Sequence, residues 1–150
     1  MENIKYTFKY KESEAVFDPS FFDVQGDGDI DDRMRRLPGV MSFWFGVLAE
    51  YKRVQSMMNE GMDLWMATEK HKLESANVGK YKSEKAKEEA VIVASTEEYM
   101  KKRKEVIDIA YYVDLLENSV CKCIIARKDT LMSMANDRRQ ELKNGMQISA

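Results

Sequence analysis

The side chains best suited to chemistry lie in a basic segment in the middle of the chain. From Lys70 to Lys87 the sequence holds six lysines and two acids, a local charge of +4 in a chain of formal net charge −2. Tyr81 lies between Lys80 and Lys82. Lysines gathered around an aromatic ring are typical of a site that binds a polyanion. A solvated junction between two helices would carry the same pattern, so that alternative stays open.

One long helix is expected to position this segment from its N-terminal side. Pro38 suits the first turn of a helix. From Val40 to Trp65 apolar residues recur at spacings that alternate mostly between three and four, which predicts a helix over residues 38–76. The sequence Asn77-Val78-Gly79 is a helix stop signal. The basic segment is therefore expected to bend where this first long helix ends.

On its C-terminal side, two further helices are expected. Ser83 suits the cap of a short helix over residues 84–93. Ser95 and Glu98 form a capping box that predicts a last, long helix ending near residue 143. Its apolar positions cover more of the circumference than packing against one helix requires. We therefore expect neighbouring copies to cover part of this face in a homo-oligomer, at the positions Val113, Leu116, Val120 and Ile124.

The first 37 residues differ from the rest because they are acidic, with six basic and nine acidic groups. Residues 2–17 alternate loosely, which indicates a strand with a weak partner at Ala15-Val16-Phe17. Residues 18–32 contain Pro, two Gly and six Asp, so a loop is predicted there. Read as a calcium loop from Asp23, this stretch has Met34 where a bidentate Glu is required. A solvated turn is favoured, and no metal is expected.

Most catalytic classes lack the residues they need. His71 is the single histidine, so one copy assembles neither a Ser–His or Cys–His pair nor a histidine metal site. There is no phosphate loop or dinucleotide fingerprint. Cys121 and Cys123 fall on different faces of a helix, and reduced thiols in a cytosol are the default. No apolar run is long enough to span a bilayer. We expect no enzyme, no cofactor and no membrane segment.

A second basic block, Lys101-Lys102-Arg103-Lys104, lies near the start of the last helix. Glu97, Glu98 and Glu105 are three to five positions away and could neutralise it. A solvated helix face is the favoured interpretation of this block.

Several short motifs resemble the phage recombination mediator family typified by UvsY. That family carries Lys-x-Arg-Leu late in a long helix, and this chain has Lys70-His71-Lys72-Leu73. A Lys-Ser-Glu segment follows as Lys82-Ser83-Glu84, and Trp44 stands where the family has a tryptophan in its first long helix. The Tyr-rich middle of the last helix (Tyr111, Tyr112, Asp114, Leu115, Leu116) is also similar. Lys72 stands in place of the family's Arg, which keeps the charge but loses the bidentate fork.

The resemblance implies a single-stranded DNA-binding recombination mediator that helps load a RecA-like recombinase during phage DNA recombination and repair. Its partners would be single-stranded DNA, the recombinase and the single-strand-binding protein. The chain would form a homo-oligomer such as a ring, in the cytoplasm of the infected host cell. Lys70 and Lys72 are carried over by the motif. Lys80, Lys82 and Tyr81 are added on physical grounds, because lysines bind phosphates and a tyrosine can stack on a base.

The expected fold is mainly α. It consists of a long helical hairpin with a short intervening helix, a small irregular or β-containing N-terminal segment, and homo-oligomeric assembly. The expected division is an acidic N-terminal segment (1–37), a helical single-strand-binding and oligomerisation domain (38–143) and a tail (144–150). A helical structural or adaptor protein of a phage assembly that does not bind DNA is the alternative function.

Overall fold

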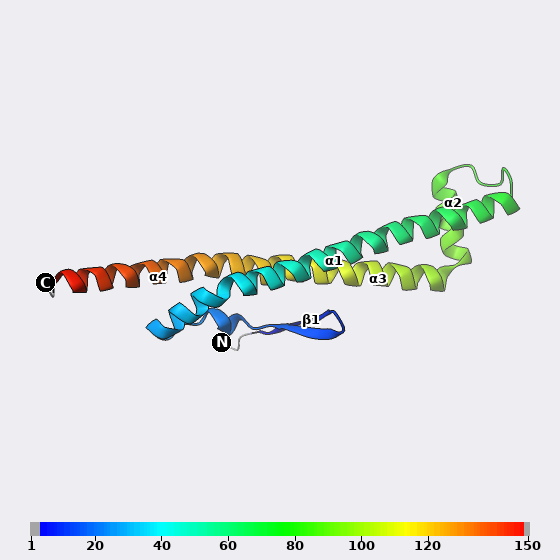
Figure 1. Ribbon diagram of the computed structural model, residues 1–150. Helices are drawn as coiled ribbons and strands as arrows, with labels where there is room; N and C mark the ends of the chain where they lie inside the picture. Colours follow the sequence, from blue (N-terminus) through cyan, green and yellow to red (C-terminus); the bar gives the residue numbers. More distant parts are fainter. Residues whose placement is uncertain (1–3, 149–150) are drawn as a thin grey trace. The chain divides into compact units, whose positions relative to one another are not determined.

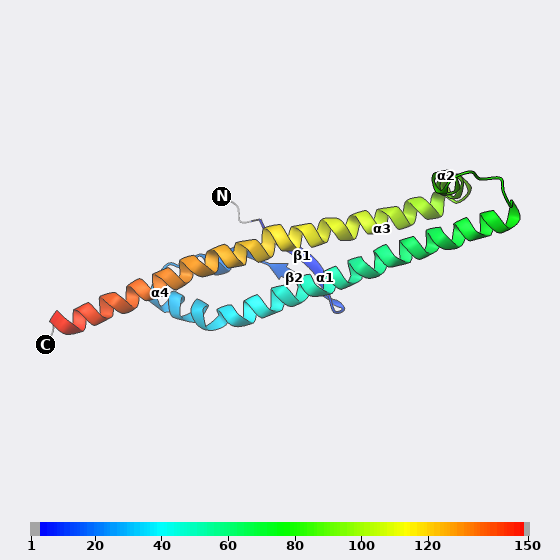
Figure 2. The same ribbon diagram turned by 90° about the horizontal axis from the view of Figure 1, so that it is seen from above.

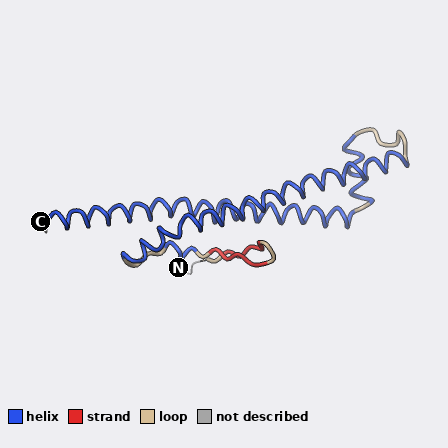
Figure 3. Tube along the Cα trace, in the orientation of Figure 1, coloured by secondary structure: helices blue, strands red, loops and turns tan. Residues whose placement is uncertain are grey.

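The computed structural model describes residues 4–148, with the side chains of residues 27, 147 and 148 left out. It is 81% helical, and strands are confined to one N-terminal hairpin (Figures 1 and 3). The predicted mainly α fold with a small N-terminal sheet is therefore confirmed. Within the described residues, no helix combines the length and the apolarity needed to cross a bilayer.

The chain forms two compact units that do not follow the expected boundaries. Unit 1 comprises Met1–Ala49 and Asp114–Ala150, and unit 2 comprises Glu50–Val113. The acidic N-terminal segment thus belongs to the same unit as the end of the chain. The expected tail from residue 144 is also helical as far as Ile148.

Unit 1 begins with the predicted hairpin. Strands β1 (Tyr6–Tyr10) and β2 (Ser13–Phe17) pair antiparallel, with Phe8 opposite Ala15. Lys11 and Glu12 make the turn with φ values of 45° and 51°, the left-handed region that a tight two-residue hairpin turn requires. Phe8, Ala15 and Phe17 are buried, because alternate residues of each strand face the same side.

Helix α1 (Asp27–Ala76) begins eleven residues before the predicted start at Pro38. The loop prediction for residues 18–32 was therefore wrong beyond residue 26, and a 3-10 turn η1 (Pro19–Phe22) precedes the helix. Four of the six aspartates that suggested a loop lie in the first turns of α1, where the helix dipole favours negative charge. Asp32 also pairs with Arg33, Arg35 and Arg36.

Pro38 lies inside the helix, whose light-blue beginning bends in Figure 2.

Trp44 is at the centre of the core of unit 1. Its ring lies 5.9 Å from that of Phe8 and 5.5 Å from that of Phe17, both edge to face, so the hairpin packs on α1. The Cys121 thiol lies 4.0 Å from the Trp44 carbonyl oxygen. Trp44 is only 5% exposed, which agrees with its predicted place on the apolar stripe.

The last predicted helix is interrupted by a wider turn. Helix α3 (Thr96–Leu115) leads into a π-helical segment η2 (Leu116–Cys121), which continues as α4 (Lys122–Ile148). The Lys122 amide donates to the Glu117 carbonyl, five residues back. Three of the six η2 residues are buried. Nothing in the composition of this stretch predicts the π segment.

Unit 2 contains the predicted helical hairpin with its short intervening helix. Tyr51 on α1 lies 6.2 Å from Tyr112 on α3, and Trp65 lies 6.4 Å from Tyr99, measured between ring centroids. The two helices therefore run antiparallel. The short helix α2 (Glu84–Ala94) lies between them in the chain, and its Val91 is 1% exposed.

Candidate nucleic-acid interface

The non-helical segment 77–83 joins α1 to α2 and carries three of the predicted site residues. Gly79 has a φ of 77°, which an L side chain rarely adopts, so the chain turns there at little cost. The Lys80 amide donates to the Asn77 carbonyl at 3.1 Å. The Ser83 hydroxyl accepts from the Ala86 amide at 3.1 Å and caps α2, as predicted. These local signals hold residues 80–82 outside any helix.

The lysines of this segment keep their charge exposed. Lys80, Lys82 and Lys85 are exposed, and within residues 4–148 none of them forms an ion pair. The Lys80 ammonium lies 5.9 Å from the centroid of the half-buried Tyr81 ring, at the outer limit of a cation–π contact. Lys85 belongs to the same charge run but was not predicted as a site residue. The sequence could have identified Lys85, because it directly follows the Lys-Ser-Glu motif.

Lys70, carried over from the family motif, is in a different environment. Its ammonium donates to Glu88 at 2.8 Å and lies 3.6 Å from Glu84, both on α2. The side chain is only 19% exposed. The hydrogen bond to Glu88, with the nearby charge of Glu84, raises the pKa of Lys70. The predicted site residue Lys70 is therefore paired and mostly covered, because α2 folds back onto α1 and brings Glu84 and Glu88 to its ammonium group.

Lys72 also has a carboxylate partner, but it remains accessible. Its ammonium donates to Glu69 at 3.0 Å, one helical turn back. The side chain is 67% exposed, so solvent screens the pair strongly. The motif therefore contains one covered lysine and one exposed lysine, each next to an acid.

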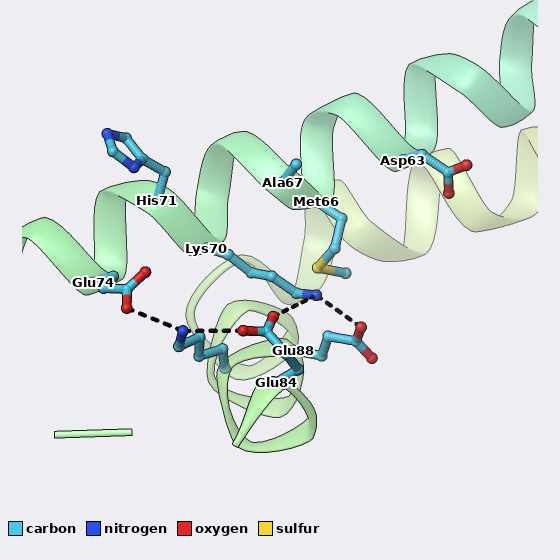
Figure 4. A pocket seen from close by; sticks show the side chains of 9 residues that line it. Asp63, Met66, Ala67, Lys70, His71, Glu74, Glu84 and Glu88 are labelled. Atoms are coloured by element: carbon cyan, nitrogen blue, oxygen red, sulfur yellow. Dashed lines mark hydrogen bonds and ion pairs between the residues drawn. The ribbon is translucent and has the colours of Figure 1, made fainter. Parts of the chain in front are cut away.

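Together the covered lysines and their acids form a charged cavity, hereafter the α1–α2 cavity, of about 390 Å³ (Figure 4). Lys87 donates to Glu74 at 3.0 Å and to Glu84 at 3.1 Å, and its side chain is 14% exposed. These hydrogen bonds raise the pKa of Lys87, and Lys87 followed by Lys70 lowers the pKa of Glu84. The ionisable residues along the wall are two lysines, four acids (Asp63, Glu74, Glu84, Glu88) and His71. The acids outnumber the lysines, so the cavity does not attract anions.

His71 contributes nothing to this charge network. Its ring points away from the ion pairs in Figure 4 and is exposed. Within the part of the chain that the structure describes, no three His, Cys, Asp or Glu side chains are grouped to hold a metal ion.

The second basic block, on α3, is largely a solvated helix face. Lys101, Arg103 and Lys104 are exposed and Lys102 is half-buried. Of the three predicted neutralising acids, Glu98 instead accepts a hydrogen bond from the Trp65 indole at 3.0 Å. No ion pair of the block occurs among the described side chains. The block adds exposed positive charge to unit 2.

The residues predicted to form the oligomer interface are buried inside their own chain. Val113 is 7% exposed, and Leu116, Val120 and Ile124 are fully covered. A wide apolar face predicts that other residues cover it. It does not predict whether those residues belong to the same chain or to a second copy. In unit 1, the thiol of the neighbouring Cys121 lies 4.0 Å from the carbonyl oxygen of Trp44 on α1. Exposed apolar side chains lie elsewhere on α1 and α3, at Met57, Leu64, Met100, Ile107 and Tyr111.

A scan against protein-family models found no match, and searches of curated proteins and of solved structures found none either.

Proposed function

We propose that this chain is a non-enzymatic, single-stranded DNA-binding recombination mediator that helps load a RecA-like recombinase in phage recombination and repair. The supporting observation is the non-helical segment 77–83, continued by the first turn of α2. Among the described side chains, Lys80, Lys82 and Lys85 are exposed there without a carboxylate partner, next to Tyr81. The motif resemblance points in the same direction.

This arrangement suits single strands better than duplexes. Lysine ammonium groups bind phosphates without reading sequence, and the face of a tyrosine ring can stack on an unpaired base. Such a base is not available inside a duplex. Binding of this kind weakens as salt rises, because it releases counterions from the strand.

Each copy would bind weakly, so assembly matters to the proposal. Several linked sites raise the affinity for one strand without any new contact. We propose a homo-oligomer such as a ring, assembled through the exposed apolar residues named above instead of through the buried Leu116 face. It would act with the single-strand-binding protein in the cytoplasm of the infected host.

A loading assay tests this function. ATP hydrolysis by a RecA-like recombinase is followed on single-stranded DNA already covered by single-strand-binding protein. We expect the wild-type chain to shorten the lag before hydrolysis, and the K80Q/K82Q variant to shorten it less. An unchanged lag with the wild-type chain at every concentration would refute the mediator function.

The exposed apolar residues of unit 2 favour a second candidate. Leu64 is 69% exposed and Tyr111 is 61% exposed, which would suit a helical structural or adaptor protein of a phage assembly. Such a protein would bind other proteins and show no affinity for oligonucleotides.

A further inference from the structure

The α1–α2 cavity contains two lysines that are charged but hidden from an approaching anion. Lys70 and Lys87 are 19% and 14% exposed, whereas their acidic partners Glu74, Glu84 and Glu88 are 55%, 72% and 50% exposed. Glu84 contacts both ammonium groups, at 3.6 Å and 3.1 Å. An anion arriving from solvent therefore meets the carboxylates before it meets the lysines.

The carboxylates have the same chemistry as the phosphates of a nucleic acid strand. Both present oxygen acceptors to an ammonium group, so each can replace the other in a charge-assisted hydrogen bond. Glu84 and Glu88 lie on α2, an 11-residue helix. A helix of this length is marginal by itself, so its position depends on its contacts. Those contacts include the buried Val91 and the ion pairs to α1.

We propose that Glu84 and Glu88 are built-in competitors of DNA, which occupy Lys70 and keep it from a bound single strand. The inference rests on the proposed function and adds a regulation to it. A strand held by Lys80 and Lys82 raises the local phosphate concentration, because segment 77–83 connects directly to α1 and α2. Even there the carboxylates hold Lys70, so the wild-type chain binds a strand with one phosphate contact fewer than its lysines would allow.

Removing the charge of Glu84 and Glu88 should increase the affinity for single-stranded DNA. Gln keeps the shape of Glu without its charge, so E84Q/E88Q exposes Lys70 to phosphate. One added phosphate contact makes the slope of log K against log salt steeper by about 0.7, which corresponds to about fivefold tighter binding to oligo-dT at about 0.1 M salt. The measurement is fluorescence anisotropy at several salt concentrations, with circular dichroism to check the helix content.

The matched control is E89Q/E97Q. It removes the same total charge from exposed acids of α2 and α3 that form no ion pair within residues 4–148. We expect it to change affinity by less than about twofold and leave the salt slope unchanged. Adding K70Q to E84Q/E88Q should remove the gain, whereas K70Q in the wild-type background should have little effect.

The outcomes separate the two claims. Equal gains in E84Q/E88Q and E89Q/E97Q, or a gain that survives K70Q, would overturn the competitor but leave the DNA-binding function standing. Absence of binding in every variant, wild type included, would overturn the function itself and the competitor with it. If the double variant loses helix content, the neighbouring single variants E88Q and E89Q decide instead. Only E88Q, which breaks the 2.8 Å pair with Lys70, should bind more tightly.

Discussion

Paired and unpaired lysines of the basic segment should respond differently to the same substitution. In K80Q/K82Q two exposed ammonium groups are lost that have no carboxylate partner among the side chains the structure describes. In K70Q/K72Q two groups are lost that each have a carboxylate within about hydrogen-bond distance, at 2.8 and 3.0 Å. The two variants carry the same net charge and lie in the same unit, so long-range electrostatics affects them equally.

The magnitude follows from counterion release. Each phosphate contact with a single strand contributes about 0.7 to the salt slope, so two lost contacts reduce it by about 1.4. At about 0.1 M salt, K80Q/K82Q should therefore bind about 25-fold more weakly than the wild type. When the salt rises from about 50 to about 200 mM, the wild-type affinity should fall about sevenfold more than the affinity of K80Q/K82Q. K70Q/K72Q should stay close to the wild-type slope.

The assay is an anisotropy titration of a short labelled oligo-dT at several salt concentrations, with one copy of the chain bound per oligonucleotide. A larger loss of slope in K70Q/K72Q than in K80Q/K82Q would refute the reasoning. It would show that the ion pairs to Glu69 and Glu88 do not reduce the availability of these lysines.

Three further predictions concern single features. Y81A should weaken binding to oligo-dT by about 1–3 kcal/mol with an unchanged salt slope. Y81F should bind as tightly as the wild type, because stacking needs the ring and not the hydroxyl. Equal losses of affinity in both variants would exclude stacking. L116A should lower the free energy of unfolding, measured by urea denaturation, by about 2–5 kcal/mol, since Leu116 is fully covered within one chain. A decrease below about 1 kcal/mol would place this side chain outside the core. The folded-state pKa of Glu84 lies below the ordinary 4.5 because of Lys87 and Lys70, so its ion pairs are complete above that pH and are lost as the pH falls through the lowered value. Circular dichroism should therefore show the wild type losing α2 helicity at acid pH, with a smaller change in E84Q/E88Q; identical acid curves would contradict the pairing.

Local signals predicted the turn that carries the site, because they depend on a few neighbouring residues. Gly79 and Ser83 fix the end of α1 and the start of α2 wherever those helices pack. The pair of Lys72 with Glu69 is one helical turn long and could be predicted from spacing. The pair of Lys70 with Glu88 spans 18 residues and depends on α2 folding back, so no spacing rule predicts it.

The start of α1 and the burial of the last helix were harder to predict from the sequence, for different reasons. Aspartates are common both in loops and in first helical turns, so Asp29 and Asp32 did not distinguish the two. An apolar face such as that of Leu116, Val120 and Ile124 shows only that water is excluded. Whether the cover comes from the same chain or from a second copy depends on tertiary packing.

The central claim is that exposed lysines in and next to segment 77–83 bind single-stranded DNA. The most direct measurement is an anisotropy titration of labelled oligo-dT, and of a duplex of equal length, with the wild-type chain at about 50 and about 200 mM salt. We predict saturable binding that prefers the single strand and weakens sharply at the higher salt. No binding to oligo-dT at the lower salt, or equal binding at both, would contradict the claim.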